Sequence, residues 1–275
     1  MKRRTFISLM GVMAAAGVLG LTGCSSKDTA ASTASSATLN KLDSIQKSGK
    51  LVVALEGAWQ PWSYHDASDT LVGYDVEVGQ AIAQKLGVKA TFVEGEWDGL
   101  LAGVEAGRYD MVINGVDVTE SRKQTYDFST PYAYIRTALV VKNDNDTIHS
   151  FEDLAGKTTA NSIGSTYMEM AESYGATCSG VDTLDETIQM VLQGRADATL
   201  NADVSFYDYL GQHPDAAIKI VASSEEANEI AIPMQKGESS AALREAVSQA
   251  IEQLRSEGTL SALSNKYFGA DISTK

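Results

Sequence analysis

Hydrophobic positions along the chain alternate between strand-like runs and segments with helical spacing from about residue 39 onward. Short apolar runs predict buried strands, and the amphipathic segments between them end at Gly87 and Gly107, as helices commonly do. The expected strands of this first block are 50–55, 89–93 and 109–113, and its expected helices are 39–48, 74–86 and 97–106. This repetition predicts an α/β fold with a mostly parallel sheet, whose ligands bind beyond the carboxyl ends of the strands.

A second block repeats the pattern. Its expected strands are 156–160, 196–200 and 218–222, its expected helices are 165–174, 184–193 and 204–210, and two closing helices follow at about 239–257 and 259–267. Two apolar runs, 135–142 and 227–234, are candidate crossings between the two blocks.

The N-terminal sequence is typical of a targeting segment. A basic start is followed by an apolar run at 6–21 and by Leu-Thr-Gly-Cys, which looks like a lipobox. We expect a lipoprotein signal peptide at 1–23, lipid attachment at Cys24 and a flexible tether rich in Ser, Thr and Ala at 24–38. The alternative is an uncleaved anchor helix, for which about 16 apolar residues are short.

Composition excludes several classes of function. The net charge of −14 argues against nucleic acid or an anionic membrane surface as partner. The three His residues stand far apart in polar loops, and the sequence has no nucleophile, phosphate-loop or metal-spaced Cys/His motif, so we expect no catalytic site, metal or cofactor. With Cys24 lipidated, Cys178 has no disulfide partner and is interpreted as a small buried hydrophobe.

The stretch 114–132 carries the most specific pattern. An apolar strand end runs through a Gly-containing turn to Thr119, which can cap a short helix. Arg122 then falls in the first turn, where a cation opposes the helix dipole at a cost of about 0.3–1 kcal/mol. A carboxylate clamp would explain the guanidinium there, and a surface pair with Glu120 or Asp127 is the alternative.

This stretch resembles the signature of the bacterial extracellular solute-binding proteins of family 3, the polar amino-acid receptors of ABC importers. The matching residues are Thr-Glu-Ser-Arg at 119–122, Phe-Ser at 128–129 and Pro-Tyr at 131–132, and the resemblance covers about 40–272. It implies a two-lobe fold of the type II periplasmic binding proteins, crossed twice at a hinge, with lobes at 39–137 plus 232–275 and at 138–231. Several runs, including 159–167 and the C-terminus, are similar to the cystine/cysteine branch.

The resemblance also implies a ligand site. It assigns the α-carboxylate of an amino acid to Arg122, aided by Ser165 and Thr166, and the ligand side chain to an aromatic pair, Trp59 and Trp97, which otherwise would be core residues. It also places Glu56 and Ser162 near the ligand side chain. The strand-end argument adds Asn114 and Gly115, and Asn201 is expected to contribute to closure of the lobes. Trp62 is interpreted as a packing residue.

One position departs from the family. The residue that usually binds the ligand ammonium is an Asp, but here it is Ala202, with Asp203 one residue later. We therefore expect Asp117, which stands where the family commonly has Ser or Thr, to bind the ammonium. The alternative is that Asp117 pairs with Arg122 and Asp203 turns inward, although Asp203 can also simply cap the next helix.

The sequence thus predicts an extracytoplasmic, lipid-anchored and monomeric receptor that binds a polar amino acid, with cystine or cysteine as candidates. Its expected partners are an ABC permease and the ATPase of that permease. A sensory receptor is one alternative. The other is an enzyme, a cyclohexadienyl-type dehydratase on the same fold, for which Glu56 would have to act as general acid.

Overall fold

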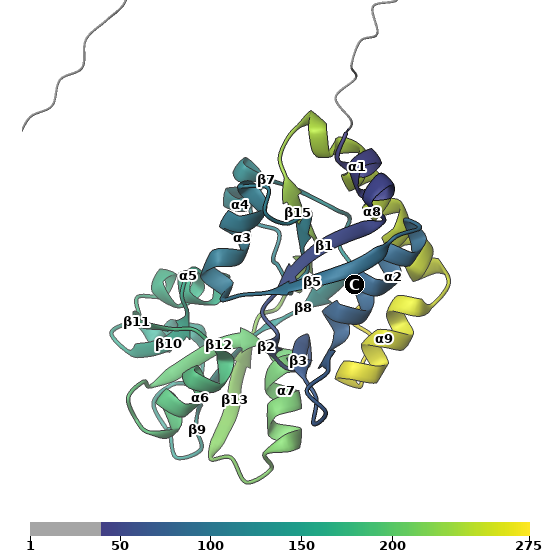
Figure 1. The fold of residues 1–275 in the computed structure, drawn as a ribbon. Helices are drawn as coiled ribbons and strands as arrows, with labels where there is room; N and C mark the ends of the chain where they lie inside the picture. Colours follow the sequence, from purple (N-terminus) through teal and green to yellow (C-terminus); the bar gives the residue numbers. More distant parts are fainter. Residues whose placement is uncertain (1–39) are drawn as a thin grey trace, which may run out of the picture. The chain divides into compact units, whose positions relative to one another are not determined.

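The computed structural model describes residues 40–275, which form two lobes, each built on a five-stranded sheet (Figure 1). The helices are α1 (Lys41–Ser48), α2 (Tyr74–Lys85), α3 (Trp97–Glu105), α4 (Glu120–Thr125), α5 (Thr166–Ser173), α6 (Leu184–Leu192), α7 (Asp203–Gln212), α8 (Glu238–Ser256) and α9 (Thr259–Phe268), with a 3-10 turn at Phe151–Leu154. The expected signal peptide, Cys24 and the expected tether lie outside the described residues. Within residues 40–275, no helix is both long and apolar enough to span a membrane.

The two sheets share one design. The strands of the first lobe are β1 (Lys50–Leu55), β5 (Lys89–Glu94), β6 (Met111–Val112), β7 (Tyr126–Phe128) and β15 (Pro233–Gln235), and those of the second are β9 (Thr137–Lys142), β10 (Thr158–Ser162), β11 (Thr177–Val181), β12 (Ala198–Ala202) and β13 (Ile218–Ser223). Their orders are β5-β1-β6-β15-β7 and β11-β10-β12-β9-β13. In each sheet one strand, β15 or β9, runs against its neighbours, and the remaining strands run parallel to one another. The expected mostly parallel, two-lobe fold is confirmed.

A two-stranded ribbon joins the lobes. Its strands β8 (Ala133–Ile135) and β14 (Asn228–Ile230) pair antiparallel, and each leads directly into the reversed strand of one sheet. The first crossing is therefore earlier than the expected 135–142, because β9 already belongs to the second sheet. The ribbon also touches the C-terminal segment, since the Tyr134 amide donates to the Ile272 carbonyl at 2.7 Å.

The core of the first lobe follows from the alternation of side chains along β1. Leu51 and Val53 join the large apolar cluster beneath α1, α2 and α8, whereas Ala54 joins a separate cluster on the other face with Leu100 and Val104 of α3. Helices on both faces bury the sheet, so only its edges and strand ends remain free to form a site.

Several elements differ from the expectations. A small sheet of β2 (Ala58–Trp59), β3 (Ser63–His65) and β4 (Leu71–Val72) follows β1, and neither it nor β7 and β11 was predicted. The expected strand 109–113 is reduced to β6, because only Met111 and Val112 keep ladder pairing with β1. The expected helix cap is confirmed: the Thr119 hydroxyl accepts from the Arg122 amide at 3.1 Å.

Candidate functional site

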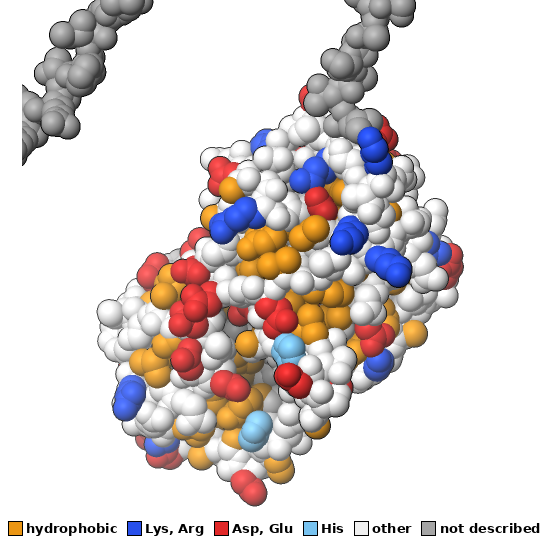
Figure 2. All heavy atoms as spheres, viewed as in Figure 1, with side chains coloured by type: hydrophobic (Ala, Val, Ile, Leu, Met, Phe, Trp, Pro, Cys, Tyr) orange, Lys and Arg blue, Asp and Glu red, His pale blue; other side chains and the backbone are white. Residues whose placement is uncertain are grey.

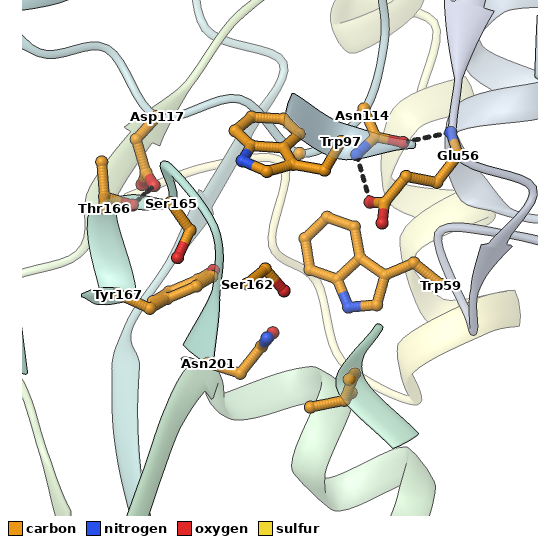
Figure 3. Close-up of a pocket in the computed structure, with 12 residues that line it drawn as sticks. Glu56, Trp59, Trp97, Asn114, Asp117, Ser162, Ser165, Thr166, Tyr167 and Asn201 are labelled. Carbon is orange, nitrogen blue, oxygen red and sulfur yellow. Dashed lines mark hydrogen bonds between the residues drawn. The ribbon is translucent and has the colours of Figure 1, made fainter. Parts of the chain in front are cut away.

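A pocket with an empty volume of about 400 Å³ lies between the lobes, where the carboxyl ends of β1 and β6 face those of β10 and β12 (Figure 3). Its lining consists of Glu56, Trp59, Trp97, Asn114, Gly115, Asp117, Ser162, Ser165, Thr166, Tyr167, Leu184 and Asn201. Ten of the twelve site residues expected from the sequence therefore meet here, and Arg122 and Asp203 do not belong to the lining.

At one end of the pocket, Glu56 and Asn114 form a paired unit. The Asn114 side chain accepts from the Glu56 amide at 2.8 Å and donates to its carboxylate at 2.6 Å. Burial raises the pKa of Glu56 to about 7, and the hydrogen bond from Asn114 only partly opposes that shift. An approaching cationic group would favour the charged form of this carboxyl group.

The Trp59 ring forms an aromatic wall of the pocket, and its position is fixed by packing against Trp62. Trp59 stacks on Trp62 with ring centroids 5.2 Å apart, and Trp62 donates across the lobes from Nε1 to the Ser205 hydroxyl at 3.0 Å. Gly115 closes this wall, because its φ of +56° suits glycine and an added Cβ would lie 2.6 Å from the Trp59 ring. Trp62 is fully buried, and it joins the lobes as well as packing.

Asp117 lies at the opposite end of the pocket. It is only 5% exposed, its Oδ2 accepts a short hydrogen bond from the Thr166 hydroxyl of the other lobe, and its Oδ1 is buried without a partner. Burial raises the pKa of Asp117, against the hydrogen bond from Thr166 and the charge of Arg122. A buried carboxylate oxygen without a donor is costly, and a ligand N–H group would satisfy it.

Arg122 contacts Asp117 but does not itself line the pocket. Its guanidinium donates to the backbone carbonyl of Asp117 at 3.1 Å and lies over the Trp97 ring at 5.3 Å. The surface pair considered from the sequence is absent among the described residues, since Glu120 pairs with Lys123 and Asp127 with Arg244. An ion pair with the Asp117 carboxylate is likewise absent there.

The second lobe contributes a helix start and a strand end. Ser165 caps α5 by accepting from the Met168 amide at 3.1 Å, so its hydroxyl is fixed at the pocket wall beside Thr166. Asn201, at the end of β12, accepts from the Ala202 amide at 2.8 Å. Asp203 begins α7 half-buried, and its carboxylate accepts from the Val204 amide at 2.8 Å.

Two lining residues, Tyr167 and Leu184, were missed by sequence reasoning. Tyr167 directly follows Thr166 in the first turn of α5, so the stretch that predicts Thr166 contains it, but its spacing gave no reason to single it out. Leu184 begins α6 and reaches the pocket only through tertiary packing, for which the local sequence holds no signal.

The outer mouth of the cleft is acidic. Glu94, Glu96 and Asp98 of the first lobe line neighbouring hollows together with Asp182 of the second. Figure 2 shows carboxylates gathered along the boundary between the lobes. Such a field favours zwitterionic or cationic ligands over anionic ones. Among the described residues, no His, Cys, Asp or Glu cluster is arranged to hold a metal ion.

Comparisons with known proteins agree with this architecture. The family model of the bacterial extracellular solute-binding proteins, family 3, matches residues 51–270. The chain is 39% identical over 231 residues to the L-cystine-binding protein TcyA of Bacillus subtilis, covering 84% of this chain and 85% of that protein.

Two solved structures differ in how well they superpose. An ancestral arginine-binding protein bound to arginine matches with a TM-score of 0.75 at 36% identity, covering 80% of this chain and 99% of its own. The L-cystine solute receptor of Neisseria gonorrhoeae in the unliganded open conformation matches with a TM-score of only 0.57 at 40% identity, covering 82% and 95%. The better match to a liganded protein fits the hydrogen bonds between the lobes from Thr166 to Asp117 and from Trp62 to Ser205.

The matched family model spans most of the chain, and the fold and the strand-end pocket agree with it. The chain belongs to the bacterial extracellular solute-binding proteins, family 3.

Proposed function

We propose that this protein captures a free polar amino acid between its two lobes and presents it to an ABC permease. As a member of an extracellular family, it works outside the cytoplasm. The observation that carries the proposal is the buried Oδ1 of Asp117, which has no hydrogen-bond donor and belongs to a residue that lines the pocket between the lobes.

In the proposed complex, Asp117 binds the ligand ammonium. A buried ammonium without a carboxylate would cost several kcal/mol, and Ala202 offers none. Asp203 is the other carboxylate nearby, but it lies outside the lining and already accepts from its own helix. Both ends of the amino-acid backbone would then be held mainly by the first lobe.

We assign the ligand carboxylate to Arg122, together with Ser165 and Thr166. In the lobe arrangement described here the guanidinium holds the Asp117 backbone, beside the pocket wall rather than in it. A ligand carboxylate between Arg122 and the start of α5 would replace that contact with a charge-assisted one. Trp59 and Trp97 would pack against the ligand side chain.

Closure follows from contacts on both lobes. A ligand that bridges Asp117 and the start of α5 shifts the open–closed equilibrium, because only the closed form makes both sets of contacts.

We further propose lobe boundaries at 39–137 plus 232–275 and at 138–231, attachment to the membrane through lipid on Cys24, and action as a monomer. Coupling to a permease, rather than to a sensory partner, is part of this proposal.

Cystine is the proposed ligand. The support is the similarity to TcyA, together with polar groups at both ends of the pocket. A thermal-shift screen of the purified protein against the natural amino acids and cystine tests this. A ligand at 100 times its Kd adds about 2.7 kcal/mol of stability, so we expect a clear rise in Tm with cystine. No shift with any amino acid would contradict the proposal.

Glu56 favours one alternative, a dehydratase, because a carboxyl group with a pKa of about 7 suits a general acid. Against it stands the similarity to binding proteins. Incubation with a cyclohexadienyl acid, followed by absorbance of the aromatic product, separates the two: we expect no product above the uncatalysed rate, and turnover lost in Glu56→Gln would establish the enzyme.

A further inference from the structure

The pocket contains polar atoms that the amino-acid head does not use. Among the described residues, three buried side-chain atoms without a hydrogen-bond partner belong to the pocket lining: Asp117 Oδ1, Trp59 Nε1 and the Tyr167 hydroxyl. Asp117 is assigned to the ligand ammonium above. Trp59 and Tyr167 are 8% and 6% exposed, so water does not readily replace a missing partner.

These two atoms belong to a group of four hydrogen-bond donors. Trp59 Nε1 can only donate, and Asn201 is left with its NH2 group because its Oδ1 accepts from the Ala202 amide. Figure 3 shows Ser162 and Asn201 between Trp59 and Tyr167, on the side of the pocket away from Asp117 and Glu56. We refer to Trp59, Ser162, Tyr167 and Asn201 as the donor cluster.

A set of donors of this kind matches a group rich in acceptors, above all a carboxylate. The Glu56 carboxyl group also lines the pocket, apart from Asp117 and held by Asn114. A ligand with a cationic side chain would leave the donor cluster empty, and a ligand with an acidic side chain would face Glu56. A second ammonium and a second carboxylate together satisfy both.

We propose that the donor cluster binds the carboxylate of a second amino-acid head, whose ammonium meets Glu56, so that the site selects diaminodicarboxylic acids such as cystine. Tyr167 and Trp59 are then residues that determine specificity, beyond the stacking role expected of Trp59. The inference rests on the proposed function, since it requires a first head at Asp117.

The test uses two ligands that share one head. L-cystine carries both heads, and S-methyl-L-cysteine keeps the first head and the sulfur but lacks the second. Calorimetry on the full-length protein compares the wild type with Tyr167→Phe, which removes the hydroxyl donor and keeps the ring. Tyr207→Phe is the matched control, because Tyr207 is 59% exposed on α7 and outside the pocket.

We expect Tyr167→Phe to weaken cystine binding by about ten- to a hundredfold, the effect of losing one hydrogen bond to a charged group. Binding of S-methyl-L-cysteine should stay unchanged in Tyr167→Phe, and Tyr207→Phe should change neither ligand. Unfolding midpoints measured alongside separate loss of contact from loss of fold.

Equal losses for both ligands in Tyr167→Phe would overturn the inference, because the hydroxyl would then serve the first head or the fold. So would unchanged cystine binding in Tyr167→Phe, or wild-type affinities that are equal for the two ligands. Failure of the proposed function looks different, since the wild type would then bind neither ligand.

Discussion

Replacing Gly115 by Ala tests how tightly the pocket wall is built. Gly115 has a φ of +56°, and an added Cβ would lie 2.6 Å and 2.8 Å from two atoms of the Trp59 ring. That ring cannot simply move away, because it is buried and stacked on Trp62, which is fully buried and bonded to Ser205.

The expected loss has two parts. A left-handed φ costs an L-residue about 1–2 kcal/mol, and overpacking a filled region costs typically about 1–3 kcal/mol more. Gly87→Ala isolates the first part, because Gly87 has a φ of +73° and no atom within 4 Å of an added Cβ. We therefore expect the free energy of unfolding to fall by about 1–2 kcal/mol in Gly87→Ala and by about 2–5 kcal/mol in Gly115→Ala.

Urea denaturation gives the stabilities and calorimetry gives the cystine affinity. Only Gly115→Ala should weaken binding, because only there does the new methyl group displace the aromatic wall. Equal stabilities for the two variants, together with unchanged affinity in Gly115→Ala, would refute the close packing of Gly115 against Trp59.

Three further predictions follow from single groups. Arg122→Ala should weaken cystine binding by on the order of 3–5 kcal/mol with the fold intact, and a loss of less than tenfold in calorimetry would remove Arg122 from the site. Folding keeps Glu56 protonated up to a pKa of about 7, against an ordinary value of 4.5, so the stability from this group is present below pH 4.5 and is lost as the pH rises to 7. Glu56→Gln should make stability, measured by urea denaturation, fall less steeply over that window. The remaining slope is due to other buried carboxyl groups, including Asp75, whose pKa burial raises to about 8, and Asp117; an unchanged slope would contradict the assignment. Cys24→Ser should release the protein from membranes in a fractionation assay without changing its ligand affinity, and persistent membrane association would indicate an anchor helix instead.

Much of the fold could be predicted because local pattern and tertiary role coincide. The apolar run 50–55 is a strand with alternate residues in two core clusters, and Thr119 caps a helix through its own hydroxyl. The strands β7 and β15 could not be predicted, since they pair with each other across about a hundred residues and have only three residues each.

Most of the site residues could be predicted from the sequence for a similar reason. Parallel strands end at one sheet edge, so side chains just beyond those ends had to meet. Arg122 lies outside the pocket lining because of how its side chain packs, and the proposed role of Tyr167 follows from a missing hydrogen-bond partner. Neither property can be predicted from the spacing of residues along the chain.

The most direct test of the central claim compares Asp117→Ser with Asp203→Ser. We expect Asp117→Ser to lower cystine affinity at least a hundredfold in calorimetry, because the ligand ammonium loses its carboxylate. The stability of the empty variant should change little, since it loses a buried oxygen without a partner together with the acceptor of the Thr166 hydroxyl. Asp203→Ser should change the affinity by less than about threefold, because its carboxylate serves its own helix. Abolished binding in Asp203→Ser with near-normal binding in Asp117→Ser would show instead that Asp203 binds the ligand ammonium.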